Sequence, residues 1–252
     1  MHITLTGNLG SGKSTICKIL KEKYGFEIYS TGTVQRHLAA EMGLSVLEMN
    51  KLMCSDHKYD HLIDDTTAKI SRENPDKNIV FDSRLAWNFV EKSYKIFLSV
   101  SLDEATRRVY NDASRGAVES YKSPEECKDK LRERAANEKM RYADIYGLNY
   151  FDFSNYDLVL DSSFATPEVL AQTIVSFARK AEKEGQEEQM ILFSPLRLGY
   201  EKKVELAHSG LYPEGMVKIV EEGDDFKAAD DEGKNLVNYA GENGYQFVSC
   251  NL

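Results

Sequence analysis

The chain has 252 residues, 42% of them hydrophobic, and a formal net charge of −9. It is too apolar to be disordered, and its 16 glycines and 5 prolines are too few for a fibrous protein. The isoelectric point near 5.2 argues against a general binder of nucleic acid or anionic membranes, so any anionic ligand must meet locally concentrated positive charge.

Residues 1–181 alternate between predicted strands and helices, which is typical of a parallel α/β sheet. Five β-prone runs predict the strands, at residues 2–6, 26–29, 79–81, 95–100 and 156–160. Helical spacing, with start and stop signals such as Ser123-Pro124 and Gly147, predicts the helices. These lie at residues 14–24, 33–42, about 57–72, 103–112, 123–146 and 166–181, and a capping-box pattern at 45–48 opens another.

The character of the chain changes after residue 181. Residues 182–189 are polar and charged, and they read as a linker. Beyond them, strands are predicted at 190–193, 217–220 and 245–249 and a helix at 233–243. We expect residues 190–252 to form a small α+β extension that packs on the main domain.

Residues 7–14, GNLGSGKS, fit the pattern G-x-x-x-x-G-K-[ST] between a predicted strand and a predicted helix. The glycines let consecutive N–H groups point inward around an anion, and the helix N-terminus adds partial positive charge. Lys13 is expected to reach the β- and γ-phosphates of a nucleotide, and the Ser14 hydroxyl to ligate Mg²⁺. The expected nucleotide-binding residues are Gly7, Asn8, Leu9, Gly10, Ser11, Gly12, Lys13, Ser14 and Thr15.

Several arginines lie where an open α/β sheet binds its ligands, just past the carboxyl ends of predicted strands. Arg36 follows the second strand and Arg84 the third. Arg134, Glu138 and Arg141 stand at i, i+4 and i+7, on one face of one helix. Arginine grips phosphate through two parallel hydrogen bonds, so these residues are candidates for a second anion site.

The chain resembles a nucleoside monophosphate kinase of the cytidylate kinase type, over about residues 1–180. The resemblance rests on GNLGSGKST (7–15), STGTVQR (30–36), FDSRLA (81–86), KIFLSVSLDEATRR (95–108) and, most specifically, RERAANEKMRYADIYGLNYFDFSNYDLVLDSS (132–163). It implies a P-loop kinase-type fold and ATP-dependent phosphoryl transfer, with Mg²⁺, to a nucleoside monophosphate such as CMP or dCMP. Residues 190–252 are not part of this resemblance to the family.

The resemblance also implies roles for single residues. Arg36, Arg84, Arg134 and Arg141 would grip the acceptor phosphate, with Lys13, Arg84, Arg134 and Arg141 taking part in catalysis. The acceptor site would comprise Ser30, Gly32, Arg36, Asp82, Arg84, Arg134, Glu138 and Arg141. Arg108 and Arg115 would belong to a lid over the triphosphate, and residues 46–65 would form a helical flap.

Two departures from the family pattern concern base recognition. Ser83 stands where the family has glycine, and Ser99 where it has aspartate. They leave open a P-loop kinase for another small acceptor, or a nucleotide-binding regulatory module with little turnover. The four cysteines are dispersed, and no apolar run approaches the ~20 residues of a membrane span, so the expected location is the cytoplasm, without a nucleic-acid or membrane partner.

Overall fold

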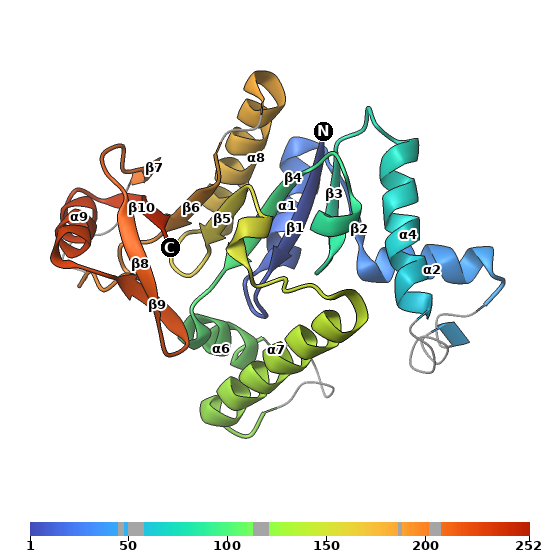
Figure 1. Cartoon of the computed structure of the whole chain (residues 1–252), viewed down its shortest axis with the longest axis horizontal. Coiled ribbons are helices and arrows are strands. Elements are labelled where there is room, and N and C mark those ends of the chain that lie inside the picture. The colour runs from blue at the N-terminus through green and yellow to red at the C-terminus, as the bar shows by residue number, and fades with distance from the viewer. Residues whose placement is uncertain (45–47, 50–57, 113–120, 186–187, 202–207) are drawn as a thin grey trace.

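The computed structural model describes residues 1–44, 48–49, 58–112, 121–185, 188–201 and 208–252. In this part of the chain one sheet runs through the whole molecule (Figure 1). Its strand order is β2-β3-β1-β4-β5-β6-β10-β8-β9, with β7 paired to β10. The strands are β1 (His2–Gly7), β2 (Glu27–Ser30), β3 (Ile79–Asp82), β4 (Tyr94–Ser99), β5 (Leu158–Asp161), β6 (Met190–Phe193), β7 (His208–Leu211), β8 (Val217–Glu222), β9 (Asp225–Ala228) and β10 (Tyr245–Asn251).

The helices alternate with β1 to β6 along the chain, and one more lies among the later strands. They are α1 (Lys13–Tyr24), α2 (Thr31–Glu41), α4 (Lys58–Glu73), α5 (Ala86–Phe89), α6 (Leu102–Tyr110), α7 (Pro124–Tyr146), α8 (Pro167–Glu184) and α9 (Asp231–Glu242). A short 3₁₀ turn, η2, spans Phe153–Asn155. No helix among the described residues is long and apolar enough to cross a membrane.

The five strands predicted for residues 1–181 are β1 to β5, and each is parallel to its sheet neighbours. The α/β fold with a parallel sheet is therefore confirmed. The glycine stop signals also hold, because Gly25 and Gly147 end α1 and α7 at φ angles of 74° and 68°. Because β1 to β5 all run parallel, their carboxyl ends lie at the same end of the sheet, where α6 and α7 also lie (Figure 1).

Both faces of the parallel strands are covered, which explains their nearly continuous apolar sequences. On one face, α1 and α8 pack together against β1, β4 and β5 in a cluster that includes Leu5, Leu20 and Ile174. On the other face, α2, α4 and α5 close a second cluster around Phe81 of β3. Sequence patterns miss α5, which has only four residues, and the first three residues of the capping-box pattern at 45–48 lie outside the described residues.

The extension, residues 190–252, continues the sheet. Strand β6 adds parallel to β5, and β10 pairs antiparallel with β6. One hydrophobic cluster contains Phe97 and Val159 of the core strands together with Val217 and Val248 of the extension. Helix α8 runs to Glu184, two residues beyond the start of the expected linker. Whether the extension folds as a unit of its own stays a prediction.

Candidate active site at the carboxyl ends of the strands

The loop between β1 and α1, residues 7–14, is called the phosphate loop here. Gly10 and Gly12 adopt left-handed backbone conformations, with φ of 78° and 85°, and a Cβ on Gly10 would lie 3.0 Å from the Cα of Ala105. Asn8 fixes the loop to β4, because its backbone N–H donates to Leu98 O and its Oδ1 accepts from Val100 N, both at 3.1 Å. The loop therefore needs glycine where it turns and where it meets α6.

The inner side of this loop carries an unused polar group. The hydroxyl of Ser11 is buried, and it has no hydrogen-bond partner among the described residues. Buried hydroxyls in native proteins normally have a partner, so this one is suited to a phosphate oxygen or its water shell. The Ser14 side chain, at the start of α1, is exposed on the same loop.

Lys13 lies among other charged groups. Burial, followed by the charge of Arg84, lowers its pKa to about 8. Asp82, at the end of β3, is affected in the opposite sense, since burial raises its pKa although Lys13 and Arg84 oppose the shift. Two cations held side by side in a partly desolvated position favour a polyanion between them.

Arg84 connects the phosphate loop to α7. Its Nη1 donates to the carbonyl oxygen of Gly7 at 2.9 Å, and its Nε donates to Oε2 of Glu138 at 2.9 Å. The hydroxyl of Tyr150 donates to the same Glu138 oxygen at 3.0 Å, and the Arg84 guanidinium lies 5.8 Å from the centre of the Tyr150 ring. Thr6 supports this segment from β1 through a hydrogen bond to Ser83 O at 3.0 Å.

Glu138 gathers the charges on this side of the site. Arg134 Nε contacts its Oε1 at 3.2 Å, as the i, i+4 spacing predicts. Burial alone would raise the pKa of Glu138, but Arg84, Tyr150 and Arg134 together outweigh it and hold the pKa below its usual value. The structure thus brings Lys13, Asp82, Arg84, Arg134 and Glu138 into one group beside the phosphate loop.

The other predicted acceptor residues lie elsewhere on α7 and α2 or outside the described residues. Arg141 is exposed on α7, with its guanidinium 6.0 Å from the centre of the Tyr142 ring. Ser30 caps α2, since its hydroxyl oxygen accepts from Thr33 N at 3.2 Å, and Gly32 lies in the first turn of that helix. The side chain of Arg36, all of Arg115 and half of the expected flap at 46–65 lie outside the described residues.

Arg108, expected in a lid, contacts the other side of the phosphate loop. Its Nη1 donates to Gly10 O at 3.4 Å, and its Nη2 donates to Ser162 O at 2.6 Å and to Ser163 O at 3.3 Å. Glu104 holds its Nε at 2.7 Å. A cavity of about 400 Å³, called the donor cavity here, opens at this point. Its lining includes Gly12, Thr15, Arg108, Phe164, Ala165 and Pro167.

Sequence reasoning missed Tyr150 and the loop at 162–166. The loop follows β5 directly, so its place past the carboxyl end of a predicted strand was the available signal. Tyr150 gave no such signal, because only the folded chain brings this aromatic residue to Glu138, twelve residues earlier.

Helix α7 is tied to the rest of the protein at two points. Arg132 Nη2 contacts Asp224, in the turn between β8 and β9, at 2.6 Å. At the C-terminal end of the helix, the Tyr146 hydroxyl donates to Asp64 of α4 at 2.5 Å. The helix that carries Arg134, Glu138 and Arg141 therefore spans from the extension to α4.

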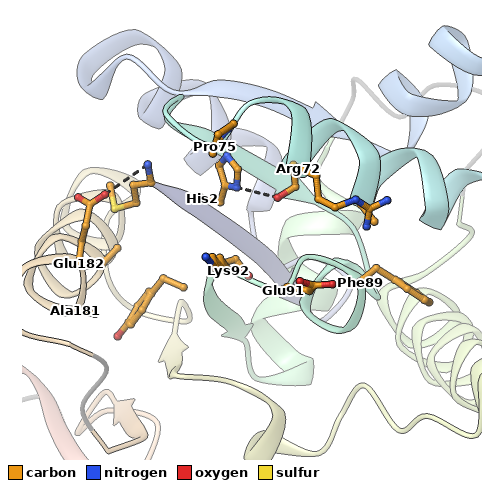
Figure 2. Close-up of a pocket in the computed structure, with 14 residues that line it drawn as sticks. His2, Arg72, Pro75, Phe89, Glu91, Lys92, Ala181 and Glu182 are labelled. Atoms are coloured by element: carbon orange, nitrogen blue, oxygen red, sulfur yellow. Dashed lines mark hydrogen bonds and ion pairs between the residues drawn. The ribbon is translucent and has the colours of Figure 1, made fainter.

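A separate cavity of about 570 Å³ lies at the opposite ends of the strands (Figure 2). His2 at the start of β1, Arg72 of α4 and Glu182 of α8 line it, and no residue of the phosphate loop does. It is not part of the site described above.

A phosphate loop at the carboxyl ends of a parallel sheet, faced by a cluster of arginines, defines a P-loop enzyme of the kinase class. The sequence model of the cytidylate kinase-like family matches residues 2–164, and the chain belongs to that family. The cytidylate kinase of Methanocella arvoryzae is 36% identical over 163 residues, which cover 65% of this chain and 88% of the relative. The extension lies outside the residues that the family model matches.

Two further similarities have a different character. A protein of Lacinutrix mariniflava named S-adenosylmethionine-dependent nucleotide dehydratase is 32% identical over 181 residues, covering 71% of this chain but 36% of that protein. The crystal structure of an uncharacterized protein from Eubacterium ventriosum superposes with a TM-score of 0.52 at 16% identity, over 71% of this chain and 98% of the other. The second likeness concerns the fold alone.

Proposed function

We propose that this protein transfers the γ-phosphate of ATP to a nucleoside monophosphate, with CMP or dCMP as the acceptor. The observation that carries the proposal is the placement of Arg84, which contacts the phosphate loop at Gly7 and the α7 carboxylate of Glu138 at once. A kinase acting on a phosphorylated acceptor must hold a second anion beside the donor phosphates, and Arg84 is positioned for that task. The family relatives named cytidylate kinase support the choice of acceptor.

The acceptor phosphate would be gripped by Arg84 and Arg134, which Glu138 already orients, together with Arg141 and Arg36. Two of these arginines are held by one carboxylate, so little conformational entropy remains to be lost when the anion binds. Asp82 and Glu138 would position the nucleoside.

The donor nucleotide would place its base in the donor cavity and its phosphates on the phosphate loop. The cavity is large enough for a heterocycle and part of a ribose, and it meets the loop at Ser11 and Gly12. Arg108 already bridges the two, and with Arg115 it would cover the triphosphate and exclude water.

A Mg²⁺ ion would be held by the Ser14 hydroxyl and by phosphate oxygens of ATP. The exposed hydroxyl of Ser14 and the unpartnered, buried hydroxyl of Ser11 fit such a hydrated metal–phosphate group. When bound, the ion neutralises charge on the β- and γ-phosphates.

The chemistry needs positioning and charge neutralisation more than proton transfer, because an acceptor phosphate oxygen is already an anionic nucleophile. Lys13 would stabilise the negative charge that spreads over the phosphoryl group during transfer, and Arg84 would hold the acceptor in line with that group. Burial first, and the charge of Arg84 second, lower the pKa of Lys13, so a bound anion would restore favourable surroundings for its charged form.

A second candidate is a nucleotide-binding module with little turnover of its own. It is favoured by the relative from Lacinutrix mariniflava, in which the matching region is about a third of a protein named for a different reaction. A P-loop kinase for another small acceptor also stays open, because Ser83 and Ser99 depart from the family pattern.

A coupled assay of ADP release separates these candidates. The full-length protein is incubated with ATP and Mg²⁺ and, in turn, CMP, dCMP, UMP and AMP. Turnover with CMP or dCMP supports the proposal, and EDTA is expected to abolish it. Turnover with UMP or AMP instead supports a P-loop kinase that acts on another small acceptor. ATP binding by calorimetry without turnover on any acceptor supports the binding module.

A further inference from the structure

An arginine of the extension is buried beneath the ends of β4 and β5. Arg197 follows β6, and its side chain is only 2% exposed. Its Nη1 donates to Asp161 Oδ1 and to Ser99 Oγ, both at 2.9 Å, and its Nε donates to Asp225 Oδ1 at 2.7 Å. The guanidinium also stacks over Phe193, 4.5 Å from the ring centre. A buried charge with this many partners has one orientation, and its partners are fixed with it.

The carboxylate of Asp161 connects Arg197 to the loop after β5 and restricts the conformation of that loop. Asp161 is fully buried, and its Oδ1 accepts from Ser163 N at 3.0 Å and from the Ser163 hydroxyl at 2.6 Å. Its Oδ2 accepts from Ser194 N, just after β6, at 3.1 Å. The Ser163 hydroxyl oxygen in turn accepts from Ser101 N, at the start of α6, at 2.9 Å.

The same loop is in contact with the phosphate loop. The carbonyl oxygens of Ser162 and Ser163 accept from Nη2 of Arg108, whose Nη1 donates to Gly10 O. An unbroken series of hydrogen bonds thus runs from Arg197 through Asp161 and the 162–163 loop to Arg108 and Gly10. Every member after Asp161 adjoins the donor cavity or the phosphate loop.

We propose that Arg197 is a positioning residue for the donor nucleotide, through which the extension holds the 162–166 loop and Arg108 ready for ATP. This inference rests on the proposed function, because that proposal assigns the cavity to the donor. Arg197 bonds to Ser99, one of the two departures tied to base recognition, but its other hydrogen bonds go to Asp161 and Asp225. The hydrogen bonds of Arg84 go instead to Gly7 and Glu138. A loop that is fixed in advance loses less entropy when it binds a ligand. Loss of Arg197 is therefore expected to weaken ATP binding and to leave the affinity for the acceptor nearly unchanged.

The test compares donor and acceptor affinities in the full chain after Arg197→Met, which keeps an unbranched apolar stem and removes the charged guanidinium. The KM for ATP, and the Kd for ATP measured by calorimetry, are expected to rise about tenfold. The KM for the nucleoside monophosphate is expected to stay within about twofold. Arg197→Lys, which can still reach Asp161, is expected to recover part of the ATP affinity.

Arg132→Ala is the matched control. It breaks a different ion pair between core and extension, Arg132 with Asp224, and this pair includes no member of the series. Both substrate affinities are expected to stay within about twofold. If Arg197 only supports the fold, its loss lowers the active fraction, and therefore kcat, with both KM values unchanged. That result, or an equal rise in both KM values, would overturn the proposal.

Removal of Arg197 leaves the buried Asp161 without a cation to balance its charge, so two further variants guard against loss of folding. Asp225→Asn alters the accessible partner, which is 36% exposed, and is expected to shift ATP affinity in the same direction by a smaller factor. The double variant Arg197→Met with Asp161→Asn removes both buried charges. It is expected to weaken the binding of ATP but not that of the acceptor. An unchanged ATP affinity in a folded double variant contradicts the proposal.

Calorimetry also separates this proposal from the proposed function. If the wild-type chain binds ATP without turnover and Arg197→Met weakens that binding, the positioning role stands and the kinase proposal fails. If the wild-type chain turns over and the variant binds ATP equally well, the kinase proposal stands and the positioning role fails. A wild-type chain that does not bind ATP contradicts both.

Discussion

Arg84 and Glu138, 54 residues apart in the sequence, form an ion pair at 2.9 Å between the end of β3 and the middle of α7. The two side chains are 15% and 20% exposed, so water screens the pair only in part. This pair joins the phosphate loop to the helix that carries the expected acceptor residues.

Glu138→Gln tests the pair through stability. The free energy of unfolding is expected to fall by about 1–3 kcal/mol at pH 7, because charge-assisted hydrogen bonds are replaced by neutral ones. The folded-state pKa of Glu138 is lowered, so its contribution is present above the unfolded pKa of about 4.3 and is lost as the pH falls through the folded value. Chemical denaturation should therefore show the wild-type and variant curves converging in acid. Glu133→Gln, exposed on the same helix, is the control, and an equal loss there contradicts the assignment.

Lys13→Ala is expected to abolish turnover in the ADP-release assay, since no other cation of the phosphate loop can reach the γ-phosphate. Lys18→Ala, on the exposed side of the same helix α1, should leave kcat and both KM values unchanged. Retained turnover in the Lys13 variant would place phosphoryl transfer elsewhere.

The pH dependence of ATP use follows from the pKa of Lys13, which is lowered to about 8 in the free protein. The value of kcat/KM for ATP is expected to fall about tenfold per pH unit above that value, as Lys13 loses its proton. Bound phosphate favours the charged form, so kcat at saturating ATP should fall only at higher pH. A Lys13→Arg variant does not titrate in this range, and any residual activity should lack the decline.

The same pKa sets the sign of a stability effect. The unfolded chain holds a proton on this lysine up to a pKa of about 10.4, whereas the folded chain releases it near 8. Between these values the unfolded state binds more protons, so the contribution of Lys13 to the free energy of unfolding rises with pH. Denaturation of the wild type and Lys13→Met at pH 7 and pH 10 measures the difference, and a fall would contradict the burial of this amine.

Arg141→Ala is expected to raise the KM of the nucleoside monophosphate about tenfold and to lower kcat, with little change in the KM for ATP. Arg132→Ala, on the same helix but bonded to Asp224, serves as the control. Unchanged acceptor kinetics in the Arg141 variant would remove this residue from the acceptor site.

Deletion of the residues after Gln189 tests whether the core folds stably without the extension. The deletion removes β6 to β10 and uncovers Phe97, Phe153 and Val159, which pack against the extension. Loss of so much apolar contact is expected to lower the melting temperature sharply or to leave the truncated chain aggregated. A truncated chain that melts within a few degrees of the full one would show that the extension is a separate unit.

Local patterns were enough to predict β1 to β5 and the phosphate loop. Alternating strands and helices, the glycine stops at Gly25 and Gly147 and the Ser123-Pro124 start each depend on neighbouring residues, so sequence alone contains them. The i, i+4 contact between Arg134 and Glu138 was predictable for the same reason.

The rest of the site depends on contacts between distant segments. Nothing local indicates that Tyr150 reaches Glu138, or that Arg197 reaches Ser99 across 98 residues. The short strands β7 and β9 were also missed, because four residues of mixed polarity carry no periodic pattern. The order of the strands in the sheet is a further property that a hydrophobic pattern does not encode, because it depends on which strands pair along their edges.

The position of β10 has a consequence for how the chain is assembled. In the sheet, β8 and β9 connect to β6 only through β10, which follows them in the sequence. During synthesis from the N-terminus, the β8–β9 hairpin is therefore made before the strand that joins it to the core. The β8–β9 hairpin can therefore join the sheet only once β10 is available to lie between it and β6. A chain that stops before β10 is expected to lack the contact between Asp225 and Arg197, so the network that ends at Arg108 would be incomplete.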